Sequence, residues 1–597
     1  MIEKLMIRGG SMRKLRRGLF LGVVLLVSVL SWSTLGLAVE IFPLEGIRPG
    51  LRGIGKTVIA GNTIEDFDVE VLGLVPQSPP LSNLILIKVS GGVIDKAGGI
   101  AQGMSGSPVY VQGKLLGALG YTFAYTDHRL GLVTPAGDMF KLYDQLAPVE
   151  ALPEPELPED AAPVSSPLLI QGLNRRNTEY LTGALTKTLS PYEVQVLPAL
   201  AANTPTFQAP LQPGSMVGVQ LLRGDFQVAS FGTVTHVQED GRFIAFGHPF
   251  THRGEVDFFA STAYVHYTLA NLEMPYKITS LGSTVGSVRQ DRTAGLGGSL
   301  GLEPTYIPIT IVVHDQDSGH HQDYYVEVVK QGDIMIPLVI SSAYQSVDAT
   351  LDRVGEGTSF VRLEFTTGNL SQRMIRENLF YSDTDIAVWS LTDLLAGLEL
   401  LMNNSVQEVD LQQIKVDVEV AQTRKTATIE KATPNKFNVR PGEYVDVEVS
   451  IRPYRSPAET RILRLQIPQE TTPGLLTVTV RGGGAGYYVV KPPVHTSILT
   501  QSEDDDEPIR AVVSGAETLD ALVTEYMDRE RNNEIVAEFY PFLENYEEDS
   551  HLDDGDEDLG EPINLYGWAD GSPEVNRVRL STQFVMDGMA TFDLNIY

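Results

Sequence analysis

Short runs in which apolar and polar residues alternate recur along most of this chain of 597 residues. Phe67, Val69 and Val71 fall on one side of such a run, and acidic residues fall on the other. A period of two residues is typical of a half-buried β-strand. Turn residues separate the runs, and the chain holds 55 glycines and 35 prolines. We therefore predict a mainly β fold with few helices.

A chain of this length is too long for one hydrophobic core, so several domains are expected. Proline-rich acidic stretches and changes of periodicity set the predicted boundaries. They give a signal peptide at 1–38, a β-barrel unit at 39–147, a linker at 148–168, a second β-rich unit at 169–375, a connecting helix at 376–408, an immunoglobulin-like β-sandwich at 409–500 and an acidic C-terminal region at 501–597.

The first 38 residues have the three parts of a secretory signal. Basic residues precede an apolar run from Leu19 to Trp32, and small residues end at Ala38. This order predicts export with cleavage after Ala38, to the cell envelope, the periplasm or the exterior. An uncleaved membrane anchor is the alternative, although the apolar run is short for a full span.

Charge and cysteine content narrow the class of protein further. The net charge of −31 should repel nucleic acid phosphates and anionic lipids, so nucleic acid is excluded as a partner. The chain has no cysteine, which leaves no disulfide and no thiol chemistry. Each exported domain must therefore be stable through its packed core alone.

One stretch carries a candidate nucleophile. Gly103-Met104-Ser105-Gly106-Ser107-Pro108 lies between apolar segments, in front of a Gln-Gly-Lys turn. Gly103 and Gly106 permit a turn sharp enough to expose the Ser105 hydroxyl, with the N–H groups of Gly103 and Ser105 as candidate oxyanion donors. A glycine- and serine-rich hairpin loop without chemistry is the alternative interpretation.

The longer string Gly-Gly-Ile-Ala-Gln-Gly-Met-Ser-Gly-Ser-Pro resembles the nucleophile segment of the SpoIVB-type serine peptidases. A second stretch, ending in Gly247-His248, resembles that family's histidine segment. The resemblance covers about 45–140 and 213–310. It implies two chymotrypsin-like β-barrel units and a hydrolase that cleaves proteins or peptides without a cofactor, with Ser105 as nucleophile and His248 as general base.

The chain departs from the family's pattern in three ways. The serine precedes the histidine, no peptide-binding PDZ segment is evident, and Ser90 stands where the family has an aspartate. Catalytic groups are defined by geometry rather than by chain order, so permuted barrels can still bring the two residues together. Asp291 is our first candidate for the third residue. The other candidates are Asp95, Asp225 and Asp257.

Two further histidine patterns are interpreted as structural. His248, His252, Glu255 and Asp257 suggest a metal site, but Pro249 argues against a helix that would align the rings. No metal is therefore expected. His236 lies on an apolar strand and is expected to have a structural role or to line a substrate groove.

Two classes of function follow from these patterns. The first is an exported serine endopeptidase. The second is a catalytically inactive envelope protein that keeps peptidase-like barrels for binding or as a scaffold. The distance between the Ser105 hydroxyl and the His248 ring is the geometric feature that separates them.

Overall fold

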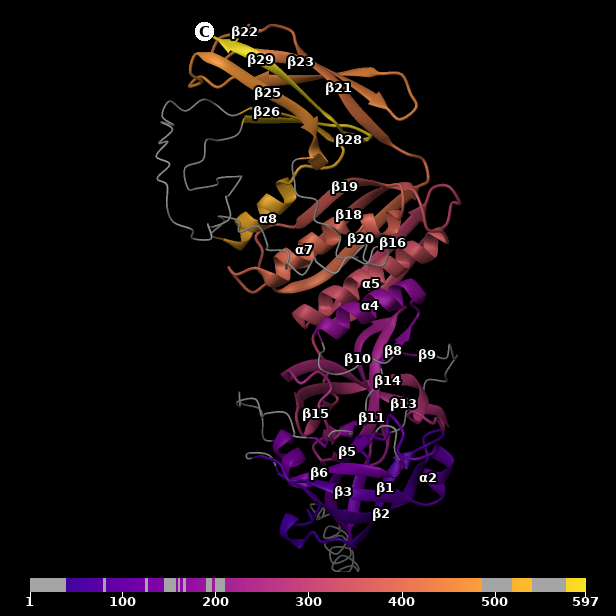
Figure 1. The fold of residues 1–597 in the computed structure, drawn as a ribbon. Coiled ribbons are helices and arrows are strands. Elements are labelled where there is room, and N and C mark those ends of the chain that lie inside the picture. The colour runs from indigo at the N-terminus through magenta and orange to yellow at the C-terminus, as the bar shows by residue number, and fades with distance from the viewer. Residues whose placement is uncertain are drawn as a thin grey trace, which may run out of the picture.

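The computed structural model describes 39–78, 82–123, 127–143, 157–158, 161–164, 168–188, 196–198, 210–485, 518–539 and 576–597. The predicted signal peptide and the acidic runs at 503–507 and 547–558 lie outside these residues, as does most of the predicted linker. The described chain is mainly β, as the alternating pattern predicts. Figure 1 shows the first barrel at one end of the molecule and the C-terminal sheets at the other.

The first unit is a closed barrel of six strands. Its strands are β1 (Arg52–Val58), β2 (Ile64–Val75), β3 (Leu84–Ser90), β4 (Pro108–Val111), β5 (Lys114–Phe123) and β6 (Leu130–Pro135). They pair in the order β4-β1-β2-β3-β6-β5, and pairing of β4 with β5 closes the ring. The alternating residues Phe67, Val69 and Val71 are all buried in its core. Short α2 (Gly92–Ala97) precedes the serine loop, and α3 (Ala136–Phe140) follows β6.

The second unit starts a sheet of thirteen strands. Its first six long strands are β10 (Met216–Gly224), β11 (Gln227–Val237), β12 (Arg242–Ala245), β13 (Gly254–Leu269), β14 (Tyr276–Arg292) and β15 (Gly295–Leu300). They pair in the order β10-β13-β14-β15-β12-β11, and β10 also pairs with β11. These pairings form a second closed ring. Short β8 (Leu168–Gln171) and β9 (Val196–Pro198) extend it beyond β11.

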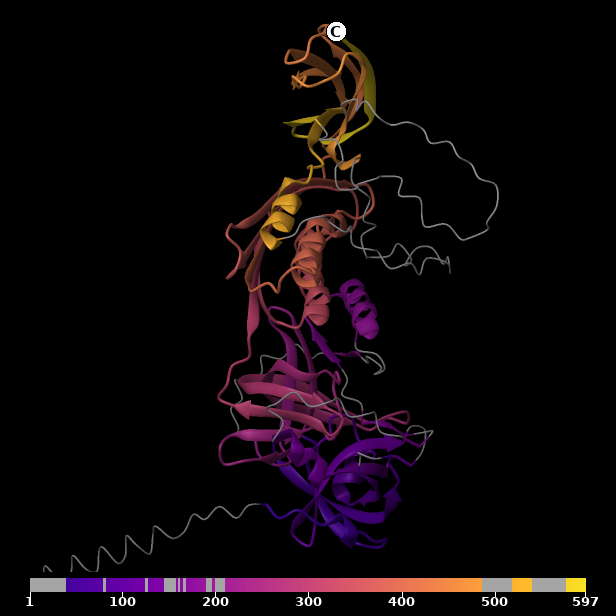
Figure 2. The same ribbon diagram turned by 90° about the vertical axis from the view of Figure 1, so that its left-hand side faces the viewer.

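The same sheet continues away from the barrels as an open, curved layer. This part contains β16 (Tyr306–Asp315), β17 (His321–Val329), β18 (Gly357–Thr367), β19 (Met374–Ser382) and β20 (Leu411–Ala421). Figure 2 shows helices on one side of this layer. They are α4 (Arg175–Thr188), α5 (Gly332–Leu351), α6 (Ile386–Trp389) and α7 (Thr392–Asn403).

Two helical stretches in the described residues, Gly332–Leu351 and Ile386–Asn403, have the length and composition of a membrane span. The apolar window of Gly332–Leu351 is 94% buried inside the protein, and that of Ile386–Asn403 is 50% buried. Ile334, Leu338 and Val347 of α5 belong to the same core as the strands of the second sheet. Burial against the sheet accounts for the apolar character of α5.

The C-terminal sheets differ from the predicted boundaries at two places. β20 pairs with β16 and β18 in the second sheet, although its sequence was assigned to the sandwich. The sandwich core combines two sheets, which contain β21 (Thr426–Pro434), β22 (Asn438–Val439), β23 (Tyr444–Pro453), β24 (Glu459–Gln466), β25 (Gly474–Gly482), β26 (Glu534–Phe539), β27 (Asn576–Ser581), β28 (Val585–Asp587) and β29 (Met589–Ile596). The described parts of the region from 501 onward, 518–539 and 576–597, therefore supply four strands and the helix α8 (Leu519–Asp528).

Candidate active site at the junction of the two barrels

The two barrels are joined by shared apolar clusters. Tyr143, Leu142 and Met139 of the first unit pack with Ile244 and Ala294 of the second. A separate cluster combines Val58 of β1 with residues of β8, β10, β11 and β13. The serine loop, residues 99–107, lies at this junction and makes hydrogen bonds to the second unit.

Strand β11 holds the serine loop from one side. The backbone N–H of Thr233 donates to the Ser105 carbonyl oxygen at 2.7 Å, and the Thr233 hydroxyl donates to the Gly103 carbonyl oxygen at 2.9 Å. The Thr235 hydroxyl donates to the Gly106 carbonyl oxygen at 2.8 Å. Three consecutive contacts fix the turn that carries Ser105.

The start of β14 holds the loop from the other side. Gln102 donates its N–H to the Pro275 carbonyl oxygen at 2.8 Å, and Lys277 donates its backbone N–H to the Gln102 carbonyl oxygen at 3.2 Å. The Lys277 ammonium lies 3.0 Å from the Gly103 carbonyl oxygen. Residues separated by about 170 positions in sequence thus share one small site.

Both candidate oxyanion donors belong to anchored peptide units. The N–H of Gly103 shares its plane with the Gln102 carbonyl, which Lys277 holds. The N–H of Ser105 shares its plane with the Met104 carbonyl, which accepts from the Ser107 N–H at 3.0 Å. Because a peptide is planar and trans, each held carbonyl fixes the opposite direction of its N–H. The fold thus fixes the directions of these two N–H groups.

Gly106 is required where the barrels touch. Its φ is +89°, and a Cβ at this position would lie 1.9 Å from the Thr233 carbonyl oxygen and 2.4 Å from the Phe246 nitrogen. The backbone next to Ser105 is therefore in direct contact with the backbone two residues before His248. This contact brings the serine loop and the histidine segment into the same region.

His248 lies in that region and is buried. Its Nδ1 is 2.7 Å from the Pro249 carbonyl oxygen, and its Nε2 is 3.2 Å from the Val164 carbonyl oxygen. A neutral imidazole carries one N–H, so only one of these contacts can be a hydrogen bond in the neutral ring. Burial lowers the pKa of His248 to about 4, against the opposing effect of the two carbonyl oxygens. The ring is therefore neutral at pH 7, as a general base must be.

Asp291 is also fully buried and lies under the turn that follows His248. One carboxylate oxygen accepts the Phe250 N–H at 2.8 Å, and the other accepts the His252 N–H at 3.0 Å and two bonds from Thr251. Burial raises the pKa of Asp291 although these donors favour its ionised form. His252 adopts a φ of +55°, which the bonds to Asp291 hold. The observed contacts of Asp291 thus shape the backbone after His248.

The other candidate acids have partners of their own. Asp95 forms an ion pair with Arg129 at 2.9 Å. Asp225 accepts the Tyr325 N–H at 2.6 Å, and Asp257 accepts the Thr305 N–H at 2.8 Å. Ser90, at the position of the family aspartate, ends β3 opposite Asp68 of β2. The described residues hold no cluster of three or more possible metal ligands.

His236 contacts the first unit. Its Nδ1 lies 3.0 Å from the Tyr143 hydroxyl, and its ring lies beside Phe140. Burial lowers the pKa of His236, so the neutral ring is favoured. This histidine bridges the barrel junction.

Sequence reasoning missed three features around the site. Lys277 is 3% exposed, and burial lowers its pKa to about 7. Ser107 is buried, and its hydroxyl has no hydrogen-bond partner in the described structure. His266 and Ser280 form a serine–histidine pair with 2.7 Å between Nε2 and Oγ. Because Ser280 lies within the paired strands β13 and β14, its own backbone is engaged in the ladder rather than in an oxyanion turn.

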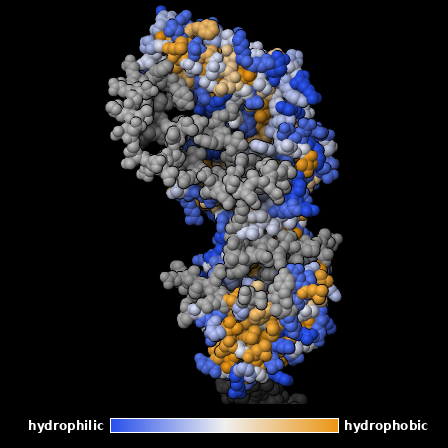
Figure 3. Space-filling model, in the orientation of Figure 1, coloured by the Kyte–Doolittle hydropathy of each residue, from blue (hydrophilic) through white to orange (hydrophobic). Residues whose placement is uncertain are grey.

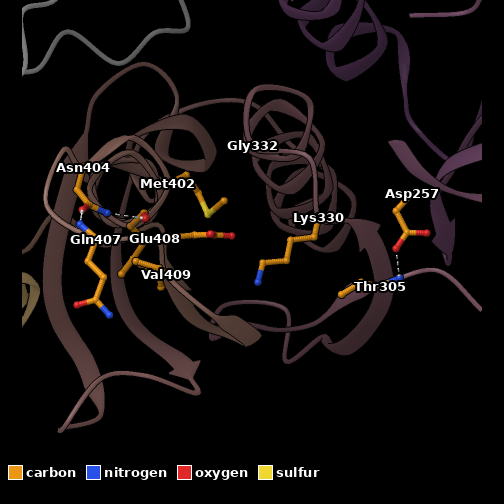
Figure 4. Close-up of a pocket in the computed structure, with 10 residues that line it drawn as sticks. Asp257, Thr305, Lys330, Gly332, Met402, Asn404, Gln407, Glu408 and Val409 are labelled. Atoms are coloured by element: carbon orange, nitrogen blue, oxygen red, sulfur yellow. Dashed lines mark hydrogen bonds between the residues drawn. The ribbon is translucent and has the colours of Figure 1, made fainter. Parts of the chain in front are cut away.

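A pocket of about 530 Å³ lies elsewhere, between the helices and the second sheet. Figure 4 shows Lys330 and Thr305 on one side and Asn404, Gln407 and Glu408 on the other. Its lining does not include Ser105, His248 or Asp291. The hydropathy surface in Figure 3 shows a separate apolar area over the lower part of the molecule.

Comparison with known protein families finds a match over the first barrel. Residues 36–139 match the family model of the SpoIVB peptidase S55. The match covers the whole first barrel, including the serine loop. No curated protein and no solved structure matches the chain.

Proposed function

Since the first barrel of this chain is a SpoIVB-type peptidase domain, we propose that the protein is an exported serine endopeptidase. In this proposal Ser105 attacks the peptide carbonyl, His248 accepts and returns the proton, and the N–H groups of Gly103 and Ser105 bind the oxyanion. The observation that supports it most strongly is the anchored serine loop between two barrels, with both candidate donor peptides held by their carbonyls.

The proposal requires a rearrangement before catalysis. Ser105 has no exposed surface, and the nitrogens of His248 face two backbone carbonyl oxygens. His248 must turn away from the Val164 or Pro249 carbonyl to accept the serine proton. Catalytic hydrogen bonds commonly form only when substrate binds, so we regard the observed arrangement as the resting state. Asp291 then acts by holding the turn that carries His248.

A serine-directed probe tests the proposal. Purified protein is treated with a fluorophosphonate, and the labelled residue is identified by peptide mass spectrometry. We expect labelling at Ser105 in the wild type and in Ser107→Ala, and none in Ser105→Ala. Ser107→Ala is the matched control, because Ser107 is equally buried two residues away. A folded wild type that stays unlabelled, or labelling that persists in Ser105→Ala, would contradict the proposal.

The complete burial of Ser105 favours a second function. A catalytically inactive envelope protein could use these barrels for binding or as a scaffold, since Ser105 is enclosed and Ser90 replaces the family aspartate. In that case no probe reacts at Ser105, and Ser105→Ala changes neither stability nor partner binding. The peptidase proposal predicts protein substrates that are cleaved, whereas the scaffold proposal predicts protein partners that bind and dissociate without cleavage.

Export is part of the proposal and has its own test. The basic and apolar N-terminal segment supports secretion with cleavage after Ala38. Sequencing the N-terminus of protein recovered outside the cytoplasm should give Val39 as the first residue. Recovery only in the membrane fraction, with the segment intact, would instead support an anchored envelope protein.

A further inference from the structure

Lys277 is a buried lysine whose ammonium has no acidic partner among the residues that the structure describes. Its Nζ lies 3.1 Å from the Thr57 hydroxyl, 3.0 Å from the Gly103 carbonyl oxygen and 3.2 Å from the Met216 sulfur. β1, the serine loop and β10 thus present only neutral groups to it. The neighbouring charge on β1, Lys56, is paired with Asp66 instead. Burying an ammonium without a counter-ion is costly, so a chain that keeps one has a use for it in many cases.

The contacts of Lys277 converge on Gln102 and Gly103, the part of the serine loop that carries the candidate oxyanion donor Gly103 N–H. Its backbone N–H holds the Gln102 carbonyl, and its side chain holds the Gly103 carbonyl together with the Thr233 hydroxyl. These two carbonyls lie on either side of the Gly103 Cα. Because peptides are planar, the two contacts set the orientation of the Gly103 N–H.

Gly103 cannot hold this orientation by itself. Its φ is +90°, a region in which glycine moves freely. A Cβ at this position would lie 3.1 Å from the Lys277 Cδ, so the lysine side chain packs directly over the turn. The packing of the Lys277 side chain and its hydrogen bond to the Gly103 carbonyl oxygen together restrain Gly103.

We propose that Lys277 is a positioning residue of the serine site, which holds Gly103 so that its N–H is directed at the oxyanion. This inference rests on the proposed peptidase function and adds a residue from the second barrel to it. Lys277 acts through Gly103 and does not itself touch the reacting atoms.

The proposal carries a pH signature. The ammonium makes a charge-assisted hydrogen bond to the Gly103 carbonyl, and the neutral amine makes a weaker one. Burial lowers the pKa of Lys277 to about 7, so this change falls near neutral pH. The advantage of the wild type over a variant without the amine should therefore shrink as the pH rises through about 7.

The test compares rates of fluorophosphonate labelling at Ser105 between about pH 6 and about pH 8. Lys277→Met keeps the length of the side chain and removes the side-chain hydrogen bonds, while the backbone N–H bond to Gln102 remains. Lys56→Met is the control on a partly exposed lysine. We expect Lys277→Met to label at least about tenfold more slowly below pH 7, because a misdirected oxyanion donor commonly costs one to three orders of magnitude. The ratio of the two rates should fall above pH 7. Lys56→Met should match the wild type throughout.

A second variant supports the same conclusion by another route. Thr233→Val removes the other donor to the Gly103 carbonyl and should slow labelling without removing the pH step. If Lys277→Met does not fold, the pH profiles of the wild type and of Thr233→Val decide. A step near pH 7 in both proteins supports the proposal, because Lys277 is present in both, and flat profiles in both overturn it.

The possible failures are distinguishable. Equal rates and profiles in the wild type and a folded Lys277→Met overturn the role of Lys277 and leave the peptidase proposal intact. A wild type that does not react at Ser105 overturns the peptidase proposal, and the positioning role with it.

Discussion

The burial of single polar residues at the barrel junction lowers the stability of the fold, and Lys277 is the clearest case. In the unfolded chain its pKa is the ordinary 10.5, whereas burial lowers the pKa to about 7 in the folded protein. Between these values the unfolded state binds more protons, so the stability of the wild type rises with pH. Below pH 7 both states are protonated, and the full cost of burying the charge is present. That cost is on the order of 5 kcal/mol.

We therefore expect Lys277→Met to be more stable than the wild type at about pH 6, by up to about 5 kcal/mol less the lost hydrogen bonds. The difference should shrink as the pH rises from about 7 towards 10.5. Urea unfolding at a series of pH values measures it. A difference that does not change with pH would show that burial does not lower the pKa of Lys277 below its ordinary value.

At the scale of elements, the serine loop depends on how closely two barrels approach. Gly106 and Gly113 have similar φ values, +89° and +80°, but only Gly106 faces another backbone. Nothing lies within 4 Å of a Cβ at Gly113. The pair thus separates the cost of a strained backbone from the cost of forcing the barrels apart.

Gly106→Ala should destabilise the protein by more than about 3 kcal/mol and abolish labelling of Ser105, because the added Cβ overlaps the Thr233 carbonyl. Gly113→Ala should cost only about 1–2 kcal/mol, from backbone strain, and should keep labelling. Thermal unfolding and probe labelling of the two variants check this. Equal losses in both would mean that the barrel contact contributes nothing.

The sequence predicts the elements better than their grouping. The serine turn was predictable because its glycines, serine and flanking apolar runs are local. Lys277 was not, because nothing within a strand sequence distinguishes a buried lysine from a solvated one. β20 alternates as clearly as the sandwich strands do, and periodicity does not specify which sheet a strand joins. β26 to β29 were missed because acidic runs dominate the composition of that region.

The C-terminal sandwich holds a buried ion network, and the segment that carries Glu530 is hydrogen-bonded to the middle of the chain. Arg481 of β25 pairs with Glu530 and Glu538, and Arg577 of β27 contacts both acids. Arg376 of β19 donates to the carbonyl oxygen of Tyr526 in the last turn of α8 and to those of Arg529 and Glu530 just after it. The described parts of the C-terminal region therefore belong structurally to two units.

Arg481→Met should destabilise the sandwich by about 3–5 kcal/mol, because it leaves two buried carboxylates short of a partner. Arg464→Met is the control, because Arg464 and Asp446 form an exposed pair on the same sandwich, where water screens their attraction and little stability is lost. The two variants are compared by urea unfolding, with proteolytic cleavage of the C-terminal unit as the measure of how much of it is unfolded. Similar small losses would show that Arg577 alone can neutralise both acids.

The bonds from Thr233 and Lys277 to the serine loop also have a consequence for timing. During synthesis the first barrel leaves the ribosome well before these residues, because proteins emerge from the N-terminus and domains fold in turn. The loop that carries Ser105 therefore cannot reach its final shape until the second barrel has been made. If the proposed peptidase function holds, a nascent or truncated chain that stops before residue 277 should be inactive, because it lacks two groups that hold the serine loop.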